Sequence, residues 1–117
     1  MQILTKESLD AAVKKCQDLS RYRVYLVTEH TNSHQDILDY LYNFNPETIR
    51  NEGGEQYVRF SNGSVIRMLS GSSSATGRIS NLVLCVEKYF NDDKTADRLR
   101  VMEIGYHMKQ GGIKNVK

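Results

Sequence analysis

The sequence has no tryptophan, a single proline and no apolar run near the roughly 20 residues that a membrane-spanning helix needs. Its first residues turn polar too soon for the apolar core of a signal peptide. We therefore expect a protein that is made and used in a cytoplasm. The net charge is only +2, so overall charge does not argue for a nucleic-acid partner, since proteins of that class usually carry a clustered basic patch.

Cysteine and histidine are also sparse, which bears on disulfides and metals. Cys16 and Cys85 fall in a predicted helix and a predicted buried strand, without CxxC spacing. They are expected to be buried, reduced thiols. His30, His34 and His107 are scattered, and two ligands on one helix face are too few for a metal site. We predict no metal site and no cofactor.

What is present is typical of one globular domain. The chain has 117 residues, of which 39% are apolar and 26% charged, and this length suits one hydrophobic core. Gly111 and Gly112 end the last helical pattern. We predict a single domain over residues 1–110 and a flexible basic tail over residues 111–117.

Apolar spacing predicts the order of the elements. A helix capped by Thr5 is followed by a strand at residues 22–28 and by a second helix after residues 31–33. Residues 43–54 have the composition of a long loop. Two strands, a buried strand at residues 81–86 and a last helix follow. The order α-β-α-β-β-β-α favours an α/β fold with helices on both faces of the sheet, and an α+β sheet with helices on one face is the alternative.

Asn62-Gly63 predicts a β-hairpin between strands at residues 56–61 and 64–69. A two-residue turn would pair Tyr57 with Met68, and this register places Tyr57 and Arg67 on opposite faces. Neither face would be purely polar. We therefore expect a hairpin covered on both sides, with its arginines reaching the margins of the sheet.

The stretch that holds this hairpin has a recognisable order. A hairpin with the pattern F-x-N-G-S-x-I is followed by a serine-rich loop ending in Gly-Arg and by a buried strand with an acidic end. The matching residues are Phe60, Asn62, Gly63, Ser64 and Ile66, then residues 72–78, then residues 82–87. Residues 22–90 thereby resemble part of the ATPase core of phage terminase large subunits, the DNA-packaging motors.

The resemblance lacks the groups that hold a nucleotide. No phosphate loop precedes residue 22, and residues 70–80 have neither its spacing nor a lysine. Val86 stands where the family has its magnesium-binding Walker B aspartate, and valine cannot coordinate a hard cation. Glu87 matches the glutamate that activates water. The resemblance thus implies a non-hydrolysing relic with no catalytic residues and with Glu87 at a vestigial Walker B position; otherwise Glu87 is a surface carboxylate paired with Lys88 or Arg78.

The basic residues of this stretch form the candidate binding site. Arg59, Arg67 and Arg78 all come from the hairpin and the loop after it, with Tyr57 nearby. Arginine and aromatic side chains anchor many interfaces and contact phosphates. We expect these four residues to form a patch for phosphate or for an acidic protein surface. The alternative is an ordinary solvent-facing margin.

These features predict a protein that binds and does not catalyse. The expected function is that of a phage or mobile-element accessory protein that binds a host protein or nucleoprotein complex, for example to inhibit a nucleic-acid-directed defence complex as anti-CRISPR proteins do. Two alternatives stay open. One is a nucleic-acid-binding protein related to DNA packaging, and the other is a degenerate NTPase whose phosphate loop comes from a partner.

Overall fold

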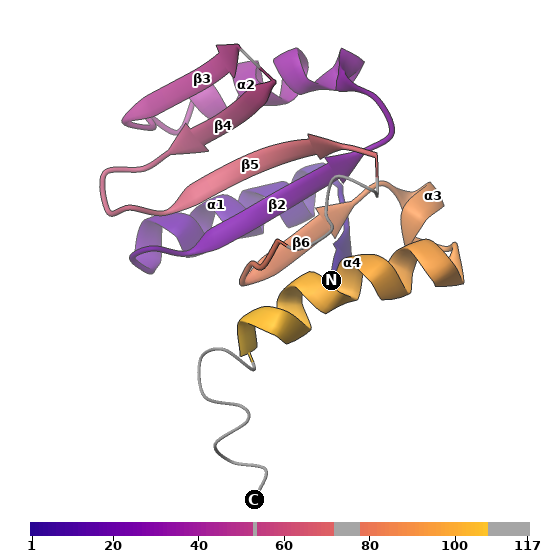
Figure 1. Cartoon of the computed structure of the whole chain (residues 1–117). Coiled ribbons are helices and arrows are strands. Elements are labelled where there is room, and N and C mark those ends of the chain that lie inside the picture. The colour runs from indigo at the N-terminus through magenta and orange to yellow at the C-terminus, as the bar shows by residue number, and fades with distance from the viewer. Residues whose placement is uncertain (53, 72–77, 108–117) are drawn as a thin grey trace, which may run out of the picture.

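The computed structural model describes residues 1–52, 54–71 and 78–107, with residues 104–107 described by backbone alone. The predicted basic tail and most of the serine-rich loop lie outside these ranges. Figure 1 shows a twisted sheet with helices on both faces, so the predicted α/β class is confirmed. Among the described residues, none of the helices combines the length and the apolar content needed to cross a membrane.

The sheet has six strands in the spatial order β1-β6-β2-β5-β4-β3. The first four of these are mutually parallel, and β4 and β3 continue the sheet in antiparallel pairing. The strands are, in chain order, β1 (Gln2–Ile3), β2 (Arg23–Thr28), β3 (Thr48–Glu52), β4 (Glu55–Arg59), β5 (Val65–Ser70) and β6 (Leu82–Cys85).

The helices divide between the two faces of the sheet. Helices α1 (Lys6–Asp18) and α2 (His34–Tyr42) lie behind the sheet in Figure 1, and α2 follows a 3-10 turn, η1 (Thr31–Ser33). The short α3 (Glu87–Phe90) and the longer α4 (Asp93–His107) lie in front of it, on the side of β6. The connections after β2 and β6 therefore lead to opposite faces.

Helix α1 begins where the sequence predicts. The Thr5 hydroxyl accepts a hydrogen bond from the Ser8 N–H at 3.0 Å, and the Ser8 hydroxyl accepts one from the Thr5 N–H at 2.8 Å. This reciprocal cap satisfies two helix-terminal donors. Leu9, Val13 and Cys16 face the sheet, as their spacing predicts. Leu19, which continues the same apolar spacing in the sequence, is 46% exposed because the helix ends at Asp18.

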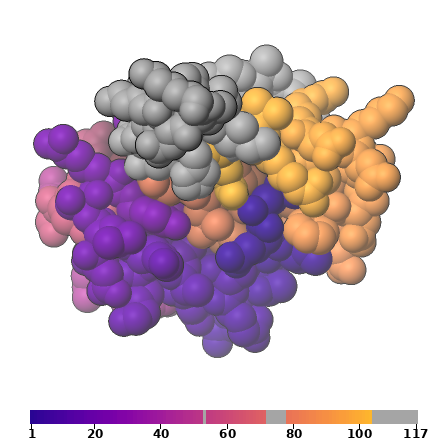
Figure 2. Space-filling view, turned by 90° about the horizontal axis from the view of Figure 1, so that it is seen from below, coloured from indigo at the N-terminus to yellow at the C-terminus, as the bar shows by residue number. Residues whose placement is uncertain are grey.

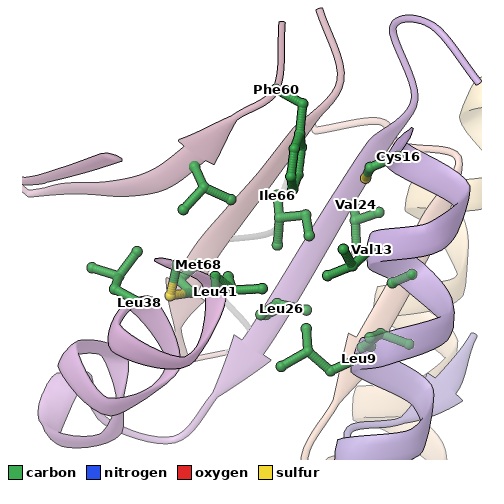
Figure 3. Packing of buried hydrophobic residues seen from close by; sticks show 13 residues of the cluster. Leu9, Val13, Cys16, Val24, Leu26, Leu38, Leu41, Phe60, Ile66 and Met68 are labelled. Carbon is green, nitrogen blue, oxygen red and sulfur yellow. The ribbon is translucent and has the colours of Figure 1, made fainter. Parts of the chain in front are cut away.

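The main core lies between the sheet and helices α1 and α2. Figure 3 shows side chains of both helices meeting those of the sheet strands, with Leu26 and Ile66 between them. Both residues are fully buried. The cluster consists of Leu9, Ala12, Val13, Cys16, Val24, Leu26, Leu38, Leu41, Val58, Phe60, Ile66, Met68 and Leu84.

A smaller core lies under α4 on the opposite face. Leu99 and Met102 of α4 pack against Val27, Leu69 and Val83 of the sheet. Seen from below, the N-terminal residues lie beside α4 (Figure 2). This second core covers the β6 side of the sheet and the carboxyl ends of β2 and β5, and it does not include β4 or β3.

Several elements differ from the prediction. The expected loop at residues 43–54 contains strand β3, and the two-residue strand β1 and the short helix α3 were not predicted. All five residues of β3 are at least partly exposed, and no buried stripe marks them. The strand forms because its backbone pairs with β4 at the edge of the sheet.

Candidate functional site

The turn between β4 and β5 decides which side chains share a face. The Phe60 N–H donates to the Ser64 carbonyl at 2.9 Å, so the turn has three residues, ending at Gly63 with φ +88°. The predicted two-residue turn is wrong by one residue. Tyr57 therefore lies opposite Arg67, and the two side chains are on one face. A shift of one residue moves every side chain of a strand to the other face.

The same face collects arginines and tyrosines from four neighbouring strands. Tyr25 of β2 lies opposite Arg67 of β5, and Arg50 of β3 lies opposite Tyr57 of β4. Arg59 and Arg23 occupy the next positions along their strands on this face. We call this surface, with the two margin residues Arg21 and Arg78, the arginine face: Arg21, Arg23, Tyr25, Arg50, Tyr57, Arg59, Arg67 and Arg78.

No helix within the described ranges packs over the β4 and β3 part of this face. Helix α4 covers Val27 and Leu69, which lie two residues beyond Tyr25 and Arg67 and therefore on the same face. Arg23, Arg50 and Arg59 are exposed. The prediction that the hairpin is covered on both sides therefore holds only at the carboxyl end of β5, where α4 packs on Leu69. Over the rest of the described hairpin, α1 and α2 lie on one side (Figure 1), and the other side carries arginines.

Tyrosine rings support the guanidinium groups. The guanidinium carbons of Arg67 and Arg59 lie 4.8 Å and 5.6 Å from the centroid of the Tyr57 ring. That of Arg78 lies 5.8 Å from the Tyr25 ring. Cation–π contacts of this kind hold a guanidinium without removing its charge or its outward-facing donors. The structure thus brings the four predicted residues to one surface, with Arg78 at its margin.

Two carboxylates balance part of the charge, and one of them, Glu52, lies 3.8 Å from the Arg50 guanidinium. Glu55 lies 3.5 Å from the Arg50 guanidinium and 3.6 Å from that of Arg67. A hydrogen bond to Tyr57, together with the charge of Glu55, raises the pKa of Arg50. By contrast, Arg21, Arg23 and Arg59 form no ion pair with any carboxylate of the described residues. The uncompensated charge therefore gathers at the end of the face nearest the β4–β5 turn.

That end of the face is concave. A cavity of about 460 Å³ opens there, and its lining includes the side chains of Arg21, Arg23, Arg59 and Arg67. Tyr25, Val24, Val65 and Gly63 complete it. A cavity lined by several guanidinium groups attracts anions, because arginine presents its donors in a fork that matches phosphate and carboxylate oxygens.

Comparison with known proteins assigns no function to this chain, so the functional argument rests on the geometry of the arginine face. No family model, no curated protein and no solved structure matches the chain. The terminase resemblance consequently stays a hypothesis that rests on the quoted residues.

Glu87 lies at a different place, beside the carboxyl ends of β2 and β6. It is exposed and begins α3, next to Val86. A cavity of about 260 Å³ there is lined by residues that include Thr28, Glu29 and Val86. Lys88 pairs with Glu29 at 3.0 Å, not with Glu87 as one interpretation expected. This crevice is a topological switch point, where open α/β sheets commonly bind ligands, but an apolar valine lines it where the resemblance needs a carboxylate.

His34 and His30 differ in their burial and in their contacts. His34 is 1% exposed, and its Nε2 lies 2.7 Å from the Thr28 hydroxyl while its Nδ1 contacts Gln56 Oε1. It links the end of β2 to α2 and β4. His30 is exposed in the turn before α2. Within the described ranges, no three metal-binding side chains come together.

Arg21, Arg23, Arg50 and Tyr25 were missed from the sequence. They come from the α1–β2 connection and from strands outside the hairpin. One signal for them was available in β2, where Arg23 and Tyr25 alternate with Val24 and Leu26 and so mark a second, polar face. Arg50 carried no signal because its strand was not predicted.

Proposed function

We propose that this protein is a non-catalytic binding protein that attaches to a nucleoprotein partner through the arginine face. The observation that carries the proposal is the gathering of six arginines around two tyrosines on one face of the sheet, whose β4 and β3 part no helix of the described residues covers. Such a surface matches a strongly anionic partner, and charge complementarity both speeds encounter and selects the partner.

The proposed role is that of an accessory or inhibitory protein of a phage or mobile element, directed at a host nucleic-acid-dependent defence complex. This role is supported by the terminase-like order of residues 60–87 combined with Val86 at the position of the magnesium ligand. Without a phosphate loop or that ligand, the site lacks the electrostatic stabilisation on which phosphoryl transfer depends. Binding is the function that the remaining residues support.

Neutralising three arginines of the face tests the proposal. In a pull-down from a lysate of the cell that makes the protein, the triple variant R59Q/R67Q/R78Q is expected to lose the partner that the unchanged protein retains. The matched control removes the same charge from α1, behind the sheet, at exposed Lys6, Lys14 and Lys15. That control, K6Q/K14Q/K15Q, is expected to retain the partner. Retention by the arginine variant at the wild-type level would show that the face is not the binding surface.

The crevice beside Glu87 favours a second candidate, an NTPase completed by a partner that supplies the phosphate loop. The cavity at the β2 and β6 carboxyl ends is the observation in its favour. This candidate predicts that Glu87→Gln abolishes nucleotide turnover in the assembled complex while assembly is unchanged. An assembled complex with no turnover above that of the partner alone removes this candidate.

A further inference from the structure

The concave end of the arginine face has the properties of a phosphate site. Arg21, Arg23, Arg59 and Arg67 reach one cavity of about 460 Å³ from two segments that are distant in the sequence, the start of β2 and the β4–β5 hairpin. Three of the four have no carboxylate partner among the described residues, and Glu55 pairs with Arg67 alone of the four. Their mutual repulsion is relieved by a bound anion with several acceptor oxygens.

The tyrosine rings at this site are already occupied. Tyr57 is only 7% exposed, and the guanidinium groups of Arg59 and Arg67 lie over its ring. A ring covered in this way cannot serve as the exposed platform on which nucleic-acid bases stack. Recognition at this end of the face therefore goes through the guanidinium groups, which contact phosphates and carry no base sequence information.

The α1–β2 connection, which carries Arg21 and leads into Arg23 of β2, is held by the β4–β5 turn. The Arg21 N–H donates to the Asn62 carbonyl, and the Tyr22 N–H donates to the Ser64 hydroxyl at 3.0 Å. That hydroxyl in turn donates to the Leu19 carbonyl at 2.6 Å. A further Cβ at Gly63 would meet Arg21 Cγ at 3.3 Å. The backbone that carries Arg21 is thus held in place before a ligand arrives, which lowers the entropy cost of binding.

We propose that the cavity lined by Arg21, Arg23, Arg59 and Arg67 binds phosphate groups of a nucleic-acid backbone without regard to base sequence. This inference rests on the proposed function and specifies which chemical group of the nucleoprotein partner is contacted. The four arginines allow up to four phosphate contacts.

Fluorescence anisotropy with labelled 20-nucleotide oligodeoxynucleotides tests the inference. Thymidine, adenosine and mixed-sequence strands are expected to bind with affinities within about threefold of one another. Because each phosphate contact on a single strand contributes about 0.7 to the slope of log affinity against log salt, four contacts predict a slope of about −3. A peptide nucleic acid of the mixed sequence, which has bases and no phosphates, is expected not to bind.

The variant R21Q/R23Q isolates the cavity from the residues used in the pull-down. At 0.1 M salt it is expected to lose about fivefold in affinity per arginine. The magnitude of its slope of log affinity against log salt is expected to decrease by about 1.4. R21K/R23K retains both charges and is expected to retain most of the affinity. K14Q/K15Q on α1 is the control for charge alone. Far-ultraviolet circular dichroism and urea unfolding establish that each variant is folded.

The outcomes separate this inference from the proposed function. Unchanged oligonucleotide affinity in R21Q/R23Q, equal binding of the peptide nucleic acid, or sequence discrimination above about thirtyfold overturns the inference. If the wild-type chain binds no oligonucleotide while R59Q/R67Q/R78Q still loses the partner, the face binds an acidic protein surface; the proposed function then stands and the inference falls. If that triple variant keeps the partner, the proposed function itself falls.

Discussion

Changing Asn62 to aspartate should destabilise the fold because the Asn62 side chain is a donor to the end of α1. Its amide nitrogen lies 2.7 Å from the Cys16 carbonyl, with the Gln17 and Leu19 carbonyls at 3.4 Å and 3.3 Å. Its amide oxygen accepts the Ser64 N–H at 3.0 Å. Asn62→Asp preserves the shape and this acceptor, and it replaces the donor by a charged oxygen that faces carbonyl oxygens.

The magnitude follows from three contributions. Losing the hydrogen bond costs about 1 kcal/mol, and leaving a partly buried carbonyl without its partner costs about 1 kcal/mol more. A negative charge at the carboxyl end of a helix adds roughly 0.5 kcal/mol. The expected loss in unfolding free energy at pH 7 is therefore about 2.5 kcal/mol. With a urea slope of about 1.5 kcal/mol per molar, the midpoint falls by about 1.7 M.

The destabilisation of Asn62→Asp should depend on pH. The protonated carboxyl can donate to the carbonyl, so the pKa of the introduced group in the folded state lies above its reference value of about 3.9. The stability that the protonated form contributes is present below that reference value and is lost as pH rises through the folded pKa. The difference in unfolding free energy between the variant and the wild type should therefore decrease as the pH is lowered from 7 to 4.

Asn81→Asp is the matched control. The Asn81 side-chain oxygen accepts the Arg23 N–H at 2.8 Å, and a carboxylate does the same, so this variant should stay within about 0.5 kcal/mol of the wild type. Urea unfolding followed by circular dichroism measures both variants. Equal losses in Asn62→Asp and Asn81→Asp would refute the assignment of Asn62 as a donor.

Two further predictions concern the core and the thiols. Leu26→Ala removes a fully buried side chain between the sheet and its helices and should lower the free energy of unfolding by about 3 kcal/mol. Leu19→Ala, at a side chain that is 46% exposed, should change it by less than about 0.5 kcal/mol. Equal losses in thermal or urea unfolding would contradict the packing described here. Burial raises the pKa of Cys16 from 9.0 to about 12 and that of Cys85 to about 11, so a thiol reagent at pH 8 should modify neither in the native protein and both in denaturant. Because the protonated thiol is favoured in the folded state, stability is retained below pH 9.0 and falls above it until the folded pKa of about 12 is passed; native labelling as fast as in denaturant would disprove this burial.

The elements with a strong apolar period were predicted well. Residues of α1 and α2 that point to the sheet recur at helical spacing, and β2 and β6 are rich in branched apolar residues. These patterns exist because one stripe or face of each element must leave water. Strand β3 lacks such a stripe, because an edge strand is held by backbone pairing that does not depend on side-chain type.

The candidate site was predicted in part for a similar reason. Arg59, Arg67, Arg78 and Tyr57 were chosen because they lie close together in the sequence, and the structure brings them to one surface. The predicted register separated Arg67 from Tyr57, since Asn-Gly most often makes a two-residue turn. Here the Asn62 side chain donates a hydrogen bond to the Cys16 carbonyl at the end of α1, and Ser61 is the third residue of the turn.

The sequence by itself determined the α/β class, the burial of β6 and the cap of α1, because each of these depends on local spacing or on one side chain and its near neighbours. Only the tertiary structure decided the edge strand, the one-residue register of the hairpin and the meeting of Arg21 and Arg23 with Arg59 and Arg67. Those features depend on backbone pairing and on contacts between distant segments, and a one-residue choice in a turn changes them without any change in composition.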